Sequence, residues 1–400
     1  MKNITTNFNK KIKKIKKNFK NQFSKKFLKK SKIYVKFVVI FFNVNNNINL
    51  KVQYLYIINY LYKMKAAICY LTQNNEVRRI YLKSSLYFLF KYFNHKFRYP
   101  VIIFHEGDYD NEGQQDIINS IRASCRDLVT FQALHPNDFK LPDHIDEKKL
   151  DRILDIKPSP VPYWRNKNYR MMCRWWLLEF MKYVKHFDYV MRLDDDSFIE
   201  EHINKDLFKW MNDNDLNYAS NLLHTDCGIC CYGMKQFFEK EYPNKKTELK
   251  SLFIPQEIPL NSVMIHPFRS ILSITQDPLP NLTDKETLWM PIMYYNNFFI
   301  TKTSFWNTPE MLEILDKIDK NGSIFYWRWG DAPIQSILAI LHSNPNQVQS
   351  AKFAYSKRLQ RESFKGNDNH YHSYMPATYD KTSCITEQKE LMDKLANLSN

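Results

Sequence analysis

Three consecutive carboxylates, Asp194-Asp195-Asp196, follow an apolar and aromatic run from Phe187 to Leu193. Such a run predicts a buried strand. Carboxylates at its end need compensating positive charge, because an unpaired buried charge is strongly destabilising. A Mg²⁺ or Mn²⁺ ion held between a pair of them and substrate phosphates would supply that charge, at the strand end where ligands of open α/β sheets collect. A solvated acidic turn is the alternative.

The net charge of +16 is concentrated at the N-terminus. Residues 1–65 hold 17 Lys and no Asp, Glu or Arg, so 41 basic and 42 acidic residues remain in 66–400. The basic charge therefore belongs to one segment, and we expect no nucleic-acid partner. The chain has only seven Gly and neither a G-x-G-x-x-G nor a Walker A pattern, which argues against a glycine-rich phosphate loop.

Two short apolar runs, 33–42 and 52–62, follow the Lys-rich start. Each is shorter than the roughly 18–20 apolar residues that a membrane span needs. A basic segment before an apolar one has the orientation of a signal anchor, so we predict that residues 1–63 contain an imperfect one. The alternative is an N-terminal tail. We assign 64–375 to a catalytic domain and 376–400 to a C-terminal tail.

Strands and helices alternate after residue 64, which predicts an α/β fold with a mostly parallel central sheet flanked by helices. Expected strands are 66–71, 99–104, 129–132, 187–193 and 294–301, and expected helices are 77–93, 114–125, 169–186, 206–214, 309–318 and 334–341. The proline-rich segment 254–291 is expected to be an extended connection. Cys227, Cys230 and Cys231 could form half a zinc site, a disulfide or plain buried thiols.

Five motifs in order resemble the fungal-type glycolipid 2-α-mannosyltransferase family, the yeast Golgi α-1,2-mannosyltransferases. They are Tyr92-Phe93-Asn94-x-x-Phe97-x-Tyr99-Pro100, Tyr169-Arg170-x-Met172-Cys173-Arg174-Trp175, Tyr189-x-x-Arg192-x-Asp194-Asp195-Asp196, Asn296-Asn297-Phe298, and Phe325-Tyr326-x-Arg328-Trp329-Gly330-Asp331-Ala332-Pro333-Ile334-x-Ser336. The resemblance covers residues 64–360. It implies a GT-A-like glycosyltransferase domain of a type II membrane protein that uses GDP-mannose and Mn²⁺ with retention of configuration.

The chain departs from the family pattern at three places. Asp194-Asp195-Asp196 replaces the family's Glu-Pro-Asp metal motif, keeping a carboxylate at both outer positions. Phe299 stands where the family has a glutamate proposed to be catalytic. Lys357 stands where the family has a metal-binding histidine, so His370 and His372 are alternative ligands, although either could be an ordinary exposed histidine.

Physical roles for the site follow from these residues. Asp194 and Asp196 would hold Mn²⁺ or Mg²⁺, which neutralises a departing diphosphate. Arg192 would pair with the carboxylates or a phosphate. The resemblance places Tyr169 and Arg174 near the nucleotide, although Tyr169 could equally be a core residue. Asp331 is either a helix cap or a site acid.

The remaining expected substrate contacts are Asp195, Arg328 and Trp329, and Trp329 and its aromatic neighbours suit either a sugar face or the core. We therefore expect a Golgi-membrane α-1,2-mannosyltransferase with a lumenal catalytic domain, which transfers mannose from GDP-mannose to a glycan or glycoprotein acceptor. Tyr169 and Asp331 are the expected catalytic residues. A catalytically inert, lectin-like or scaffold relative is the alternative. A two-metal phosphohydrolase is disfavoured, because a second ligand cluster is missing.

Overall fold

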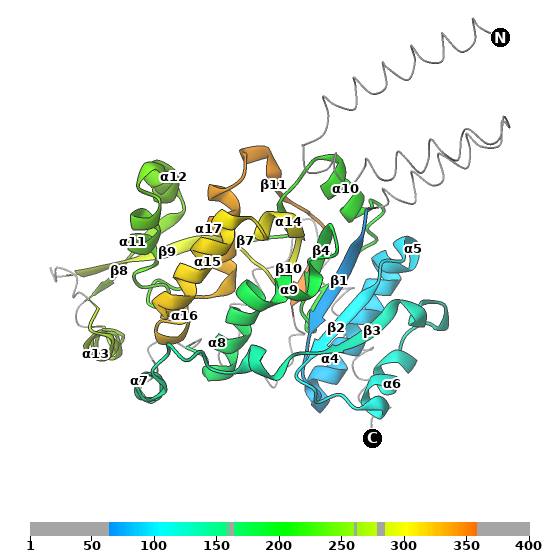
Figure 1. Cartoon of the computed structure of the whole chain (residues 1–400), viewed down its shortest axis with the longest axis horizontal. Helices are drawn as coiled ribbons and strands as arrows, with labels where there is room; N and C mark the ends of the chain where they lie inside the picture. The colour runs from blue at the N-terminus through cyan, green and yellow to red at the C-terminus, as the bar shows by residue number, and fades with distance from the viewer. Residues whose placement is uncertain (1–63, 158, 160–163, 260–261, 278–284, 358–400) are drawn as a thin grey trace, which may run out of the picture. The chain divides into compact units, whose positions relative to one another are not determined.

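A seven-stranded sheet forms the centre of the computed structural model, which describes residues 64–157, 159, 164–259, 262–277 and 285–357 (Figure 1). The strand order is β11-β6-β10-β4-β1-β2-β3. All neighbours are parallel except β10, which is antiparallel to both β4 and β6. The strands are β1 (Ala66–Leu71), β2 (Val101–His105), β3 (Val129–Ala133), β4 (Tyr189–Leu193), β6 (Tyr218–Ser220), β10 (Phe298–Lys302) and β11 (Val348–Ser350). The predicted mostly parallel sheet is confirmed.

Helices cover both faces of this sheet (Figure 1). Successive side chains of β1 alternate between the two resulting cores, with Ile68 in one and Cys69 in the other. The Ile68 side packs against α4 (Glu76–Leu89), α6 (Asn111–Asn119) and α10 (Leu207–Asp213). The core on the opposite side contains side chains from ten helices, namely α7 (Glu147–Leu154), α8 (Lys167–Arg174), α9 (Phe180–Val184), α11 (Met234–Glu241), α12 (Lys246–Ser251), α13 (Ile265–Thr275), α14 (Thr303–Trp306), α15 (Pro309–Asn321), α16 (Ser323–Tyr326) and α17 (Asp331–Leu341). The molecule is therefore a three-layer α/β/α sandwich.

Two helical segments contain a wide π-helical turn. Helix α4 continues through Phe90–Asn94 into α5 (His95–Phe97), and α8 continues through Trp175–Glu179 into α9. Both helices were predicted from the apolar periodicity, but the wide turns were not. Such turns re-aim side chains and recur at functional sites, and the second one carries Trp176, whose position is described below.

The acidic run lies where β4 ends. Strand β5 (Ser197–Ile199) follows it directly and pairs antiparallel with β12 (Tyr355–Lys357). The register places Lys357 opposite Ser197. The C-terminal end of the described chain therefore returns to the acidic run, across more than 150 residues of sequence.

Two sequence predictions about the segment before β10 are wrong. Residues 254–291 are not an extended connection, because they contain β8 (Phe253–Pro259), α13 and most of β9 (Lys285–Tyr294). Strands β8 and β9 form a small antiparallel sheet with β7 (Leu223–Thr225), in which Pro255 lies opposite Trp289 and Pro291 lies opposite Phe253. The predicted strand 294–301 is two strands, because Tyr294 ends β9 and Phe298 begins β10.

The predicted N-terminal anchor (1–63) and C-terminal tail (376–400) lie outside the described residues. Among the residues that are described, no helix has the length and apolarity of a membrane span.

Candidate active-site cleft

A cleft of about 610 Å³ opens at the C-terminal ends of the parallel strands. Residues directly after β1, β2 and β4 line it, which is the edge where ligands bind in open α/β sheets. Its volume suits a ligand of nucleotide-sugar size. Five basic and six acidic side chains line it, namely Arg78, Arg165, Arg192, Arg328 and Lys357 against Glu106, Asp194, Asp195, Asp196, Asp226 and Asp331.

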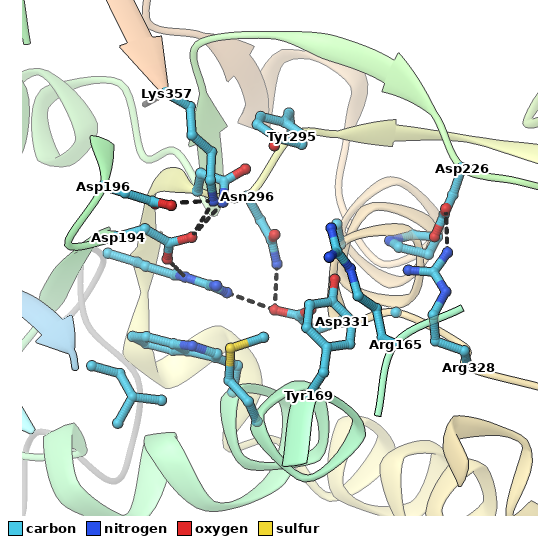
Figure 2. A pocket seen from close by; sticks show the side chains of 18 of the residues that line it. Arg165, Tyr169, Asp194, Asp196, Asp226, Tyr295, Asn296, Arg328, Asp331 and Lys357 are labelled. Atoms are coloured by element: carbon cyan, nitrogen blue, oxygen red, sulfur yellow. Dashed lines mark hydrogen bonds and ion pairs between the residues drawn. The ribbon is translucent and has the colours of Figure 1, made fainter. Parts of the chain in front are cut away.

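The two outer carboxylates of the acidic run share one ammonium group. Lys357 Nζ lies 2.8 Å from Asp194 Oδ2 and 3.3 Å from Asp196 Oδ1, and Figure 2 shows it reaching between them. Arg192 Nε donates to Asp194 Oδ1 at 2.9 Å, and the Asn297 amide donates to Oδ2. Burial would raise the pKa of Asp194, but Arg192 and Lys357 outweigh it and lower that pKa. Asp194 is therefore a permanently ionised carboxylate.

The middle carboxylate turns away from Lys357. Asp195 accepts hydrogen bonds from Arg78 Nη1 and from the Thr72 hydroxyl, both at 2.7 Å. Burial raises its pKa to about 6, against the lowering effect of Arg78. Arg78 also lies 3.4 Å from Asp196. Sequence reasoning missed Arg78 and Thr72, because a basic residue in a predicted helix gives no sign of which carboxylate it meets.

Asp331 is a buried cleft carboxylate at the first position of α17. The N-cap is Gly330, so the side chain of Asp331 is available to other partners. Its Oδ2 accepts from Arg192 Nη1 at 2.6 Å and from the Asn296 amide at 2.7 Å. Of the two alternatives left open by the sequence, a helix cap or a site acid, this geometry fits the second.

Arg192 connects the two acidic groups of the cleft. Its guanidinium pairs with both Asp194 and Asp331 and stacks on Trp176 at 4.1 Å. Burial opposes its charge, but the two carboxylates raise the pKa of Arg192 above its usual value. The wide turn after α8 thus places Trp176 under the charge network.

Tyr169 projects into the cleft from the first turn of α8. The turn is fixed by Asn166, whose side chain accepts from the Tyr169 amide at 3.0 Å. Figure 2 shows the Tyr169 ring beside Asp331, and the Arg165 guanidinium lies over that ring at 5.4 Å. Burial raises the pKa of the Tyr169 hydroxyl, so the phenol stays protonated and can donate a hydrogen bond.

A second ion pair lines the cleft away from the acidic run. Arg328 Nη2 lies 2.6 Å from Asp226 Oδ1, and both side chains are largely buried. Arg328 and Arg165 adopt left-handed φ values of 65° and 66°. Non-glycine residues rarely do so, and such strain concentrates at ligand sites. The sequence predicted Arg328 here but gave no signal for Asp226 or Arg165.

Three residues of the family motifs or next to them lie elsewhere. Arg174 does not line the cleft but forms a bidentate pair with Asp319 at 2.8 Å. Trp329 is buried in the core, where its indole donates to the Tyr232 carbonyl at 2.8 Å. Phe299 is fully buried and stacks on Tyr218 with ring centroids 5.4 Å apart. His370 and His372 lie outside the described residues.

The residues at the acidic run do not fit a divalent cation as they are arranged. Mg²⁺ binds oxygens at about 2.0–2.1 Å, in the space between two ligating carboxylates. Lys357 Nζ occupies that space between Asp194 and Asp196. Nowhere in the described chain do three or more His, Cys, Asp or Glu side chains form a group that could hold a metal ion. The cation that contacts both carboxylates is the Lys357 ammonium.

The cysteines near the cleft are free thiols. Cys227, Cys230 and Cys231 are unbridged, and burial raises the pKa of Cys230 and Cys231 well above the usual value. Of the three possibilities that the sequence left open, the structure shows thiols.

Comparison with known proteins agrees with this architecture. The family profile described as glycolipid 2-alpha-mannosyltransferase matches residues 16–374. A glycolipid 2-alpha-mannosyltransferase of Saccharomyces cerevisiae is 26% identical over 281 residues, which cover 70% of this chain and 57% of that relative. The chain thus spans little more than half the length of this relative.

Two solved structures share the fold. The mannosyltransferase Ktr4p from S. cerevisiae, in complex with GDP, aligns with a TM-score of 0.58 and 21% identity over 74% of this chain and 73% of that one. Core-mannan synthase A from Aspergillus fumigatus, in its Mn/GDP form, aligns with a TM-score of 0.56 and 19% identity over 73% and 74%. The predicted α/β glycosyltransferase fold is confirmed.

Proposed function

The chain belongs to the glycolipid 2-alpha-mannosyltransferase family, and we propose that its cleft transfers mannose from GDP-mannose to a mannose-containing glycan. One observation carries this proposal. Residues from four of the five sequence motifs, separated by up to 162 positions, converge on one cleft at the carboxyl edge of the sheet. They are Tyr169, Arg192, Asp194, Asn296 and Asp331.

The donor's diphosphate needs positive charge, and its sugar needs a carboxylate. Arg165, Arg328 and Lys357 line the cleft and supply cations. A relative of the same fold is described in complex with GDP, which supports a guanine nucleotide here. The proposed reaction does not use Mn²⁺ or Mg²⁺, because Lys357 already bridges the two carboxylates that would hold the ion.

In the proposed reaction, the bond between mannose C1 and the diphosphate oxygen breaks, and a bond from C1 to an acceptor hydroxyl oxygen forms. The hydroxyl proton leaves with the diphosphate of GDP. An α-linked product from an α-linked donor means retention. In this proposal the Asp331 carboxylate, which lines the cleft, stabilises positive charge at C1, as in retaining glycosidases, and the protonated Tyr169 hydroxyl holds a sugar oxygen.

A second candidate is an inert, mannose-binding relative. The observation that favours it is Phe299, which stands where the family has a glutamate and is packed in the core against Tyr218 and Trp176. This face of β10 therefore contributes no carboxylate to the cleft at that position. Asp331 distinguishes the two candidates, because only a transferase needs its charge.

The acceptor and the cellular location are also part of the proposal. The names of the relatives favour an α-1,2 linkage to a mannose residue of a glycolipid or glycoprotein. Enzymes with such acceptors work in the lumen of the secretory pathway, so we place the chain at the Golgi membrane, held by residues 1–63.

A donor screen tests the proposal. The full chain is incubated with GDP-mannose, GDP-fucose, UDP-glucose and UDP-galactose, each with and without methyl α-mannoside, in EDTA and in Mn²⁺. Nucleotide diphosphate release is then measured. We expect release from GDP-mannose that depends on the acceptor. Release from a UDP-sugar alone would contradict the proposed donor.

A further inference from the structure

The acidic run meets a buried lysine where a nucleotide-sugar site would hold a metal ion. Lys357 Nζ lies 2.8 Å from Asp194 Oδ2 and 3.3 Å from Asp196 Oδ1. The lysine side chain is only 11% exposed.

The lysine is held in this position by the fold. Strand β12 pairs with β5, the strand that follows the acidic run, and Lys357 lies opposite Ser197. The Tyr355 hydroxyl donates to Ser197 Oγ at 2.8 Å, and the Ser356 hydroxyl donates to Glu200 at 2.5 Å. The backbone that carries Lys357 is therefore tied to the backbone that carries the carboxylates.

Three of the four remaining carboxylate oxygens also face cations, and the fourth, Asp195 Oδ2, accepts from the Thr72 hydroxyl. Arg192 contacts the other oxygen of Asp194, and Arg78 contacts Asp195 and the second oxygen of Asp196. Three side-chain cations thus meet three consecutive carboxylates. A dication bridging Asp194 and Asp196 would have to expel the Lys357 ammonium while sharing these carboxylates with Arg192 and Arg78, which is electrostatically unfavourable in a buried site.

We propose that the Lys357 ammonium takes the place of the divalent cation, so that this chain binds the diphosphate of its donor without Mn²⁺ or Mg²⁺. The ammonium lines the cleft and has three donor hydrogens; one hydrogen bond goes to Asp194, and Asp196 forms an ion pair with the same group. A further donor hydrogen can meet a phosphate oxygen. The inference rests on the proposed function, because it takes the donor to be a nucleoside diphosphate sugar.

The test measures GDP and GDP-mannose binding to the full chain by calorimetry, in EDTA and in Mn²⁺, with bound Mn²⁺ followed separately by its electron paramagnetic resonance. Variants are Lys357→Met, which keeps the length and removes the charge, and Lys357→His, which offers a metal ligand. The control is Lys83→Met. Lys83 is also buried and ion-paired, with Asp116 at 2.8 Å, but it does not line the cleft.

We expect wild-type affinities within twofold of each other in EDTA and Mn²⁺, and no tightly bound Mn²⁺. Lys357→Met should weaken binding in EDTA at least about tenfold, while Lys83→Met should match the wild type. Lys357→His should bind Mn²⁺ and recover affinity only in its presence.

Wild-type binding that is at least about tenfold tighter in Mn²⁺ than in EDTA, with one bound ion per chain, would overturn this inference. The proposed function would be unaffected. This comparison needs no variant to fold. An absence of GDP and GDP-mannose binding in both buffers would overturn the proposed function, and the inference with it.

Discussion

Two groups of ion pairs each contain an arginine from a motif of the family resemblance, but they have different surroundings in the structure. The cleft group joins Arg192 and Lys357 to Asp194, Asp196 and Asp331. The helix group joins Arg174 to Asp319 and Glu179. Both arginines belong to motifs of the family resemblance, but only the cleft group lines the cavity.

The difference lies in how the carboxylates are shared. In the helix group one guanidinium is held by two carboxylates from α15 and the turn after α8, and it fastens helix to helix. In the cleft group, Asp194 and Asp196 follow the end of β4, and Asp331 begins α17. These ends meet at the cleft. A motif residue can therefore serve the scaffold, and only the cavity tells the two cases apart. Activity should depend on the first group and stability on the second.

The largest expected effect is on turnover in Asp331→Asn. The amide keeps the shape but removes the charge that would stabilise the reacting sugar, so turnover should fall at least about 100-fold, or about 2.7 kcal/mol. Donor affinity should change little. Initial rates of mannosyl transfer and calorimetric GDP-mannose binding measure the two quantities.

The matched control is Asp319→Asn, which alters the helix group by the same chemical change. It should leave turnover within about twofold of the wild type. Equal losses of turnover in both variants would erase the distinction between the two groups.

The next largest effect is a pH dependence of the free energy of unfolding, caused by Asp195 in the acidic run. Burial raises the pKa of Asp195 to about 6 from its model-peptide value of 3.8. Between these values the folded chain binds the proton more tightly than the unfolded chain, so the free energy of unfolding decreases as pH rises. The expected loss from pH 4 to pH 6 is about 2 kcal/mol.

Urea denaturation at pH 4, 5 and 6 measures this slope, and Asp195→Asn should flatten it. The lowered pKa of Asp194 acts in the opposite sense but only below about pH 4, outside this window. If the free energy of unfolding of Asp195→Asn decreases with pH as steeply as that of the wild type, another group causes the pH dependence.

The smallest effect is on the helix group in Arg174→Met. Loss of charged hydrogen bonds to Asp319 and Glu179 should reduce the free energy of unfolding by about 1.5 kcal/mol. GDP-mannose affinity should stay within twofold of the wild type. A tenfold loss of affinity at unchanged stability would instead place Arg174 at the nucleotide, as the family resemblance first implied.

Much of the fold was predictable, because the parallel strands are apolar runs separated by amphipathic helices. The strand before Asp194 and the helix that starts near Asp331 were both found this way. The segment 254–291 was not, because its prolines suggested an extended connection. Pro255 and Pro291 lie instead in an antiparallel ribbon, and Pro267 lies within α13.

The sequence indicated several residues of the cleft, but not most of the contacts between them. Asp194, Asp196 and Arg192 were expected at the site because carboxylates after a buried strand require a cation, and Tyr169 and Asp331 because of the family motifs. All five line the cleft. Which cation meets these carboxylates depends on contacts across more than 100 residues, as for Arg78 and Lys357. Local sequence patterns contain no information on such pairings.

The most direct test of the account is the product of a reaction with GDP-mannose and methyl α-mannoside. The full chain is incubated with both, the GDP formed is quantified, and the saccharide is identified by NMR. We predict one α-1,2-linked dimannoside for each GDP released. GDP-mannose that is bound but not consumed, across a panel of mannoside acceptors, would contradict transfer and favour the inert relative.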